Sequence, residues 1–305
     1  MPINHTIRYL EQDMTKPVIG FIGLGLMGGN MVENLQNRGY ELNVMDLNAE
    51  AVAACVARGA KAPTTAKELA ENSDIVMLCL TTSEVVEEVV YGEQGILAGI
   101  KPGATLIDFG TSIPASTKKI GAALAEKGAG MIDAPLGRTP AHAKDGLLNI
   151  MAAGDIDTFN KVKPVLDEQG ENVFHLGALG SGHVTKLVNN FMGMTTVATM
   201  SQAFAVAKQA GVDGQQLFDI MSAGPSNSPF MQFCKFYAVD GEEKLGFSIN
   251  NANKDLGYFL ALCEELGTES LIAQGTSKSL QAAVEKGLGN NDVPVIFDYF
   301  AELQA

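Results

Sequence analysis

The stretch from residue 18 to residue 46 constrains the fold of this chain more than any other part of its sequence. An apolar run, residues 18–22, has the length and composition of a buried strand and leads directly into Gly23, Gly25 and Gly28. An amphipathic stretch follows and stops at Gly39, and a second apolar run ends in an acid. This order predicts a strand, a glycine turn, a helix and a parallel second strand.

The three glycines suit a dinucleotide-binding turn, in which each has a separate mechanical role. Gly23 would make the tight turn, Gly25 would let the backbone approach a pyrophosphate, and Gly28 would let the helix pack closely on the strand. The start of the helix, with Leu26 and Met27, would then present its N–H groups to the phosphates. The alternative is a glycine-rich turn in another kind of α/β protein.

Asp46 follows the second apolar run, residues 42–45. A carboxylate at this place accepts hydrogen bonds from the adenosine ribose of NAD and repels the extra phosphate of NADP. Leu47 and Asn48 come next, and no arginine stands nearby to receive such a phosphate. The sequence therefore predicts NAD as the cofactor.

The composition excludes several classes of partner. The chain has 305 residues, and 46% of them are hydrophobic, which is ample for a sizeable core. Its formal net charge of −14 argues against nucleic acid or an anionic membrane as partner. The four cysteines lie far apart and suggest neither a disulfide framework nor a metal site, and no apolar run is long enough to span a membrane. We expect a cytoplasmic protein without a bound metal.

Apolar runs and helical patterns divide the chain after a polar N-terminal extension, residues 1–17. Runs alternating with helical stretches predict a Rossmann-like, doubly wound parallel sheet over residues 18–180. Residues 181–305 carry helical patterns and are predicted to form an all-α domain for substrate binding and dimerisation, joined to the first domain by a long helix. The predicted strands are residues 18–22, 42–45, 75–80, 105–109, 131–134 and 149–152, and the predicted helices of the second domain are 183–209, 215–221, 253–266 and 274–286.

A lysine and two amides interrupt the otherwise apolar start of the joining helix. Lys186 and Asn190 are four residues apart and share a helix face, with Asn189 alongside. We expect a helix this apolar to be buried on most sides, where an unpaired ammonium or amide is costly. A partly desolvated lysine has a lowered pKa and can exchange a proton with a substrate hydroxyl. The pattern predicts a catalytic role, against the alternative of a lysine that reaches solvent from the helix end.

A second polar cluster, Gly137, Arg138 and Thr139, follows the predicted fifth strand. It lies at the edge of the crevice where open α/β sheets bind their ligands. Arg138 is the only arginine after Arg58. Its placement in a Gly/Thr turn predicts a planar, fork-shaped ligand for a small anionic substrate. A salt bridge to a neighbouring acid is the alternative.

Together these segments resemble the β-hydroxyacid dehydrogenase family, which includes 3-hydroxyisobutyrate dehydrogenase and tartronate semialdehyde reductase. The resemblance covers nearly the whole chain from Val18 to Leu303. It implies a dehydrogenase or reductase that forms a homo-oligomer, either a dimer or a tetramer. Its marks are residues 23–28, Asp133-Ala134-Pro135 with Gly146, Gly182 with Lys186 and Asn190, and Lys254-Asp255-Leu256.

The same resemblance implies roles for individual residues. In that family the lysine matching Lys186 is the catalytic acid/base, and the asparagine matching Asn190 positions the substrate. The lysine matching Lys254 and the aromatic residue matching Phe247 lie against the nicotinamide. Leu80 at the end of the third predicted strand, and Thr81 and Thr111 in the loops after the third and fourth strands, would add to the cofactor site.

One departure from the family pattern bears on the substrate. Most members carry Ser-Gly-Gly where this chain has Gly137-Arg138-Thr139, a triplet similar to that of the sulfolactaldehyde reductase branch, in which the arginine grips a sulfonate. This resemblance implies, as the favoured expectation, an NAD-dependent reductase of 3-sulfolactaldehyde. 3-Hydroxyisobutyrate dehydrogenase and tartronate semialdehyde reductase are the alternatives, followed by a non-catalytic nucleotide-binding protein.

Overall fold

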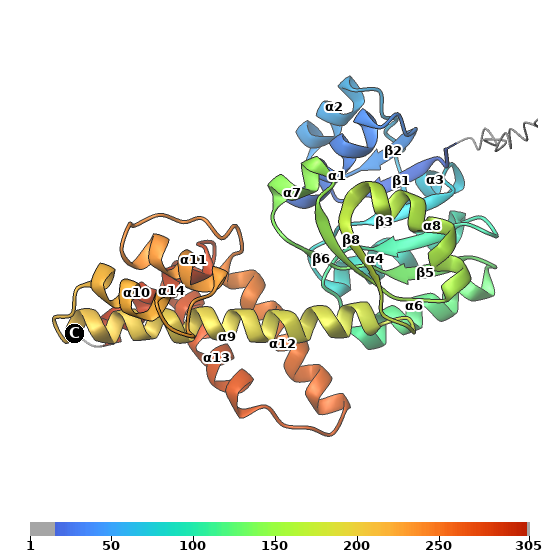
Figure 1. Ribbon diagram of the computed structural model, residues 1–305. Coiled ribbons are helices and arrows are strands. Elements are labelled where there is room, and N and C mark those ends of the chain that lie inside the picture. Colours follow the sequence, from blue (N-terminus) through green and yellow to red (C-terminus); the bar gives the residue numbers. More distant parts are fainter. Residues whose placement is uncertain (1–15, 304–305) are drawn as a thin grey trace, which may run out of the picture.

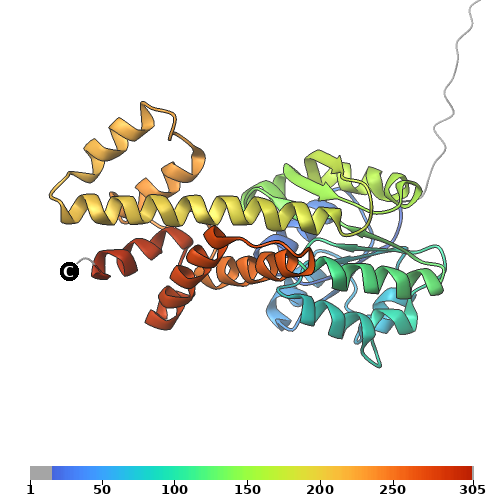
Figure 2. The ribbon, with the colours of Figure 1, turned by 90° about the horizontal axis from the view of Figure 1, so that it is seen from below.

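A computed structural model describes residues 16–303 of the chain (Figure 1). A body built around a sheet contains the N-terminal half, and a group of helices contains the C-terminal part. One long helix, α9 (Ser181–Gln209), runs out of the first body and along the second (Figure 2). The predicted N-terminal extension lies outside the described residues up to residue 15.

Five parallel strands form the main sheet in the order β2-β1-β3-β4-β5. Alternate residues of each strand face opposite sides, so Ile75 and Met77 pack into one core while Val76 and Leu78 pack into another. Burial on both faces explains why these strands read as continuous apolar runs. The strands are β1 (Ile19–Ile22), β2 (Leu42–Met45), β3 (Ile75–Leu78), β4 (Thr105–Asp108) and β5 (Gly130–Asp133).

Helices cover both faces of this sheet, which confirms the predicted doubly wound fold. Three helices contribute apolar residues to the core on one face of the sheet, namely α1 (Leu26–Asn37), α2 (Ala49–Ala57) and α8 (Ile156–Gln169). Four helices contribute to the core on the other face, namely α3 (Ala66–Glu71), α4 (Ser83–Tyr91), α5 (Ile96–Gly99) and α6 (Pro114–Glu126).

A separate three-stranded sheet follows the main one, and the sequence did not predict it. The predicted sixth strand forms as β7 (Leu148–Ala152), but it pairs antiparallel with β6 (Leu136–Gly137) and parallel with β8 (Gly170–His175) instead of joining the main sheet. Strand β8 was missed because it is polar and partly exposed, and β6 because it has only two residues. Between β6 and β7, the short helix α7 (Pro140–Asp145) packs against α1.

The C-terminal part is helical, as predicted, around a third apolar core. Helix α9 buries one stripe along its length, whereas Val188, Met192 and Val206 are about half exposed or more, so the expectation of burial on most sides is wrong for this chain. The other helices are α10 (Gly214–Ser222), α11 (Pro229–Ala238), α12 (Ile249–Glu265), α13 (Leu271–Ala283) with a π turn (Val284–Leu288), a 3-10 turn (Val293–Val295) and α14 (Ile296–Leu303). Helices α11 and α14 were not predicted. Within residues 16–303, no helix combines the length and apolarity needed to cross a bilayer.

The turn between β1 and α1 generates a stability prediction. A Cβ on Gly28 would overlap the carbonyl oxygen of Gly23, whereas a Cβ on Gly25 would meet no atom within 4 Å. Overpacking of this kind costs about 1–3 kcal/mol, and each kcal/mol corresponds to roughly 2–4 °C in Tm. In thermal melts we expect Gly28→Ala to lower Tm by several degrees, and Gly25→Ala, which replaces the N-cap of α1 without a clash, to lower it less. Equal Tm values for the two variants would contradict the packing described.

Candidate active site

The loops that follow the five parallel strands meet at one edge of the main sheet. The order of the strands reverses between β1 and β3, and ligands of open α/β sheets bind outside the carboxyl ends of the strands at such a point. The glycine turn follows β1, Asp46 follows β2, and Thr81 and Thr111 follow β3 and β4. The predicted cofactor residues of the nucleotide-binding half are thereby brought to one edge.

The glycine turn has the backbone geometry that a dinucleotide requires. Gly23 has a φ of +100°, and a Cβ there would overlap the carbonyl oxygen of Cys79. Gly28 allows α1 to approach this turn closely, while Gly25 faces space that no protein atom fills within 4 Å. The three roles predicted for these glycines therefore match the shape of the turn.

The N-terminus of α1 has free capacity for an anion. Its N-cap is Gly25, which has no capping side chain, and its first turn has no acidic residue. The neighbouring helices α2, α3 and α4 are each capped by a side-chain oxygen, from Asn48, Thr65 and Thr82. Uncapped N–H groups at the positive end of a helix fit a pyrophosphate. Leu26 and Met27 are the first residues of this helix, and Leu26 is exposed.

Asp46 is held in place by the backbone. One carboxylate oxygen accepts the N–H of Leu24 at 2.5 Å, and the other accepts the N–H of Asn48 at 2.7 Å. A carboxylate has about four lone-pair positions, so two stay available for ribose hydroxyls. The next residue, Leu47, is fully exposed.

Lys186 lies in the second turn of α9, against the segment that follows β5. Its Nζ donates a hydrogen bond to the carbonyl oxygen of Leu136 at 2.6 Å. Desolvation lowers the pKa of Lys186, and the charge of Lys254 adds to this, whereas the carboxylate of Asp255 opposes it. An ammonium with a lowered pKa gives up its proton more easily than a surface lysine does.

Asn190 and Lys254 share one carboxylate, that of Asp255 on α12. Asp255 is 1% exposed, accepts a hydrogen bond from Asn190 Nδ2 at 2.7 Å, and forms an ion pair with Lys254 Nζ at 3.0 Å. Asn189 is exposed and donates to Asn190 Oδ1 at 3.3 Å. Asp255 was named in the sequence only as part of the Lys254-Asp255-Leu256 motif, and its contacts with both Asn190 and Lys254 were not predicted.

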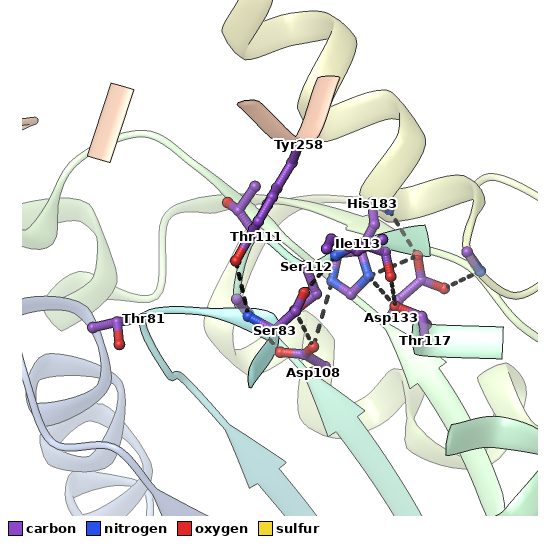
Figure 3. A network of polar contacts seen from close by, with 12 residues as sticks. Thr81, Ser83, Asp108, Thr111, Ser112, Ile113, Thr117, Asp133, His183 and Tyr258 are labelled. Atoms are coloured by element: carbon purple, nitrogen blue, oxygen red, sulfur yellow. Dashed lines mark hydrogen bonds and ion pairs between the residues drawn. The ribbon is translucent and has the colours of Figure 1, made fainter. Parts of the chain in front are cut away.

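Helix α12 also contacts the loops of the nucleotide-binding half. Lys254 Nζ donates to the carbonyl oxygen of Thr81 at 2.7 Å and lies 3.5 Å from that of Thr111. The hydroxyl of Tyr258 accepts the N–H of Ser83 at 3.2 Å, a contact that no sequence signal indicated (Figure 3). The site is thus closed from both halves of the chain.

Two further predicted residues have mainly packing contacts. Leu80 is partly buried against the core on the α4 face of the sheet and borders the glycine turn. Phe247 precedes α12, packs against the C-terminal core, and donates its N–H to Asp292 at 3.0 Å.

Arg138 forms the salt bridge to an acid that the sequence left open as the alternative to anion binding. Its guanidinium donates to the carbonyl oxygen of Leu147 at 2.7 Å and pairs with Glu171 at 2.5 Å. Its φ is +78°, the only left-handed value of a non-glycine residue within residues 16–303. Beside it, Gly137 pairs with β7, and the hydroxyl of Thr139 bonds to the ring of His142.

Comparisons with known proteins agree with this architecture. The family model for the NAD binding domain of 6-phosphogluconate dehydrogenase matches residues 18–177. The model described as the NAD-binding domain of NADP-dependent 3-hydroxyisobutyrate dehydrogenase matches residues 180–299. Between them, the two models span both halves of the chain.

Three individual proteins illustrate the range of relatives. An NAD-dependent L-serine dehydrogenase of Pseudomonas aeruginosa is 38% identical over 203 residues, which cover 67% of this chain and 68% of the relative. A 3-sulfolactaldehyde reductase of Escherichia coli is 30% identical over 281 residues, which cover 92% of this chain and 94% of the relative. The crystal structure of a 3-hydroxyisobutyrate dehydrogenase from Salmonella typhimurium has a TM-score of 0.83 and 26% identity, covering 93% of this chain and 100% of that chain.

Both domain models, the full-length relatives and the geometry of the sheet edge lead to the same assignment. The chain belongs to the β-hydroxyacid dehydrogenase family and is an NAD-binding dehydrogenase or reductase that acts on a hydroxyl group.

Proposed function

We propose that this enzyme interconverts a small acidic semialdehyde and its alcohol, with Lys186 as the proton donor and acceptor. The observation that carries the proposal is the environment of the Lys186 amine, which is partly buried, donates to the carbonyl oxygen of Leu136 and has a pKa lowered by desolvation. When bound, the dinucleotide supplies or accepts the hydride. Gly23, Gly25, Gly28, Leu26, Met27 and Asp46 would hold its phosphates and adenosine, and Leu80, Thr81, Thr111, Phe247 and Lys254 its nicotinamide end.

The proton moves on the protein side of this reaction. In the direction of reduction, the Lys186 ammonium would donate a proton to the substrate oxygen, and in the direction of oxidation the free amine would accept one. Asn190 and Asn189 would orient the substrate with their amides. Residues 18–180 would form the cofactor domain and residues 181–305 the domain for substrate and dimerisation.

We further propose a sulfonate as the acid group, which makes the enzyme a 3-sulfolactaldehyde reductase. The triplet Gly137-Arg138-Thr139 and the 30% identity to a protein of that name support this assignment. The ion pair of Arg138 with Glu171 is no strong obstacle, because the Glu171 side chain is 53% exposed and exposed pairs contribute about 0–1 kcal/mol. An incoming sulfonate would replace Glu171 as the partner.

Other substrates of the family are the rival candidates. 3-Hydroxyisobutyrate and tartronate semialdehyde carry a carboxylate instead of a sulfonate. L-Serine is a further candidate substrate, because the 38% identical relative is an L-serine dehydrogenase. A non-catalytic nucleotide-binding protein would have no need for a desolvated amine beside its cofactor. We expect a homo-oligomer in the cytoplasm.

Cofactor preference tests the role of Asp46. Its charge should oppose a 2′-phosphate, so kcat/KM with NADH should exceed that with NADPH by orders of magnitude. Asp46→Ala should narrow the gap, and Asp46→Asn, which keeps an acceptor oxygen but removes the charge, should narrow it too. Comparable kcat/KM values for the two cofactors in the wild type would refute the assignment.

Removal of the amine tests the proton transfer. Lys186→Ala should lose roughly two to four orders of magnitude in kcat, because a positioned general acid contributes about that much. The Kd for NADH, measured by fluorescence titration, should barely change.

The pH dependence of the wild type gives a second test of the same residue. Because the pKa of Lys186 is lowered, reduction should decline, and oxidation should rise, as pH increases through a value below that of an ordinary lysine. Near-normal turnover of Lys186→Ala would make this lysine structural.

Arg138 allows function to be separated from stability. Arg138→Gly relieves a left-handed backbone that costs about 1–2 kcal/mol in a residue with a Cβ, and this offsets the loss of the contacts with Leu147 and Glu171, so Tm should change little. If Arg138 binds the acid group, kcat/KM should nevertheless drop about ten- to a hundredfold or more, and Arg138→Lys should restore only part of it.

A comparison of substrates decides between sulfonate and carboxylate. Wild type, Arg138→Gly and the matched variant Glu171→Gln, which frees the guanidinium, are assayed with the sulfonate aldehyde and its carboxylate analogue. The sulfonate preference should shrink in Arg138→Gly and persist in Glu171→Gln. A wild-type preference for the carboxylate, or indifference of every substrate to Arg138→Gly, would leave Arg138 as a structural ion pair.

A further inference from the structure

A buried polar cluster lies directly beneath the start of α9 and takes no part in the proton transfer described above. It consists of Asp108 at the end of β4, Asp133 at the end of β5, and His183 in the first turn of α9, with Ser112 and Thr117 beside them (Figure 3). Asp108, Asp133 and His183 are fully buried. Ionisable groups are rarely buried to this extent without partners, so their arrangement calls for a reason.

The carboxylate of Asp133 caps α9 from another strand. Its two oxygens accept the N–H groups of Gly180 and His183 at 2.8 and 2.7 Å. The N-cap residue of α9, Gly180, has no side chain that could do this locally. A Cβ on Gly182 would overlap Met151 and Asp133, so the first turn of the helix sits directly on the carboxylate. A negative charge at this end of a helix is favourable.

The same segment of chain holds the Lys186 amine. Leu136, three residues after Asp133, provides the carbonyl oxygen that accepts the hydrogen bond from Lys186 Nζ. Asp133 fixes the first turn of α9, and the second turn carries Lys186 back to Leu136. The carboxylate, the helix turn, the amine and the carbonyl group therefore form a closed ring of contacts.

The side chain of His183 connects this ring to the loop after β4. Its Nδ1 lies 2.8 Å from the hydroxyl of Thr117, which itself donates to the carbonyl oxygen of Ile113 at 3.2 Å. Its Nε2 lies 3.7 Å from an oxygen of Asp108. Asp108 in turn accepts the N–H of Gly110 at 2.8 Å and the hydroxyl of Ser112 at 2.7 Å, which brackets Thr111.

We propose that Asp133 and His183 are positioning residues that hold Lys186 in a fixed position relative to the loop between β4 and α6. The inference rests on the proposed function of Lys186 as proton donor. Neither residue touches the reacting atoms in this scheme. They act through the backbone of α9, whose first turn they fix to the ends of β4 and β5.

The test uses His183→Leu, His183→Asn, Thr117→Val and Asp133→Asn in the full chain. Asparagine can place an amide near the position of Nδ1 and so preserve the contact with Thr117. Leucine removes both polar contacts of the imidazole, those with Thr117 and with Asp108. We expect kcat to fall about a hundredfold in His183→Leu, the order of loss that a displacement of about 1 Å produces. His183→Asn should retain part of the activity, Thr117→Val should show a milder loss, and the KM for NADH should change little in all of them.

A second readout needs neither cofactor nor substrate. The rate at which an acylating reagent modifies Lys186, followed by peptide mass spectrometry over a range of pH, gives the pKa of the amine separately from its accessibility. Asp255 and Lys254, the charged groups that face this amine, are unchanged in the variants. A displaced amine gains water, so its pKa should rise towards the ordinary lysine value in His183→Leu and Asp133→Asn. A purely structural cluster would lower Tm without moving this pKa.

Ser201→Ala is the matched control, because Ser201 is a buried polar residue of the same helix that contacts Cys234 far from Lys186. It should keep the wild-type kcat and amine pKa. Folded His183→Leu and Thr117→Val with wild-type kcat and wild-type amine pKa would overturn the proposal, even if Asp133→Asn fails to fold. Turnover by Lys186→Ala, assayed in parallel, would instead overturn the proposed function.

Discussion

The contact between the start of α9 and the carboxylate of Asp133 is the interaction on which the arrangement of the two halves depends. The main sheet ends at β5, and the helix that carries Lys186 begins where the N–H groups of its N-cap residue, Gly180, and of His183 in its first turn donate to that carboxylate. A helix whose N-cap residue is glycine has no local means of satisfying its first N–H groups. The acid from β5 meets that need and also fixes the direction in which the helix leaves the sheet. Burial raises the pKa of Asp133, and the N–H groups of Gly180 and His183 oppose this rise, so the helix end helps to keep the acid ionised.

Strand order explains why residues distant in sequence meet at one edge. In a parallel sheet all carboxyl ends point the same way. The glycine turn, Asp46, Thr81 and Thr111 follow four of the strands and Asp133 ends the fifth, so they share one border of the sheet. Helix α12 then closes this border from the other half, through Lys254 and Tyr258. The sheet thus provides rigid positions at this border, and the helices provide side chains that complete the site.

The sequence predicted the parts of the fold that depend on local pattern. Long apolar runs with glycine turns identified the main strands, and helical periodicity identified α9, α10, α12 and α13. Strand β8 escaped because its residues alternate little in polarity, and its stability comes from pairing with β7, a contact between distant residues. For the site, spacing along a helix indicated Lys186 and Asn190, but Asp255 and Tyr258 became visible only once α12 was placed across the loops after β3 and β4. Likewise, the partnership of Arg138 with Glu171 depends on how β8 lies beside β7, which no local signal records.

The length of α9 has a mechanical consequence. The helix is a single element of 29 residues, anchored by its first turn to the sheet and by its later turns to the C-terminal core. From Lys186 to its last residue it extends roughly 35 Å, at about 1.5 Å per residue. Such a rod works as a lever, since a tilt of about 5° at its base would swing the far end by roughly 3 Å. A contact that moves the distant end of the helix would therefore change the alignment of the Lys186 amine near its base.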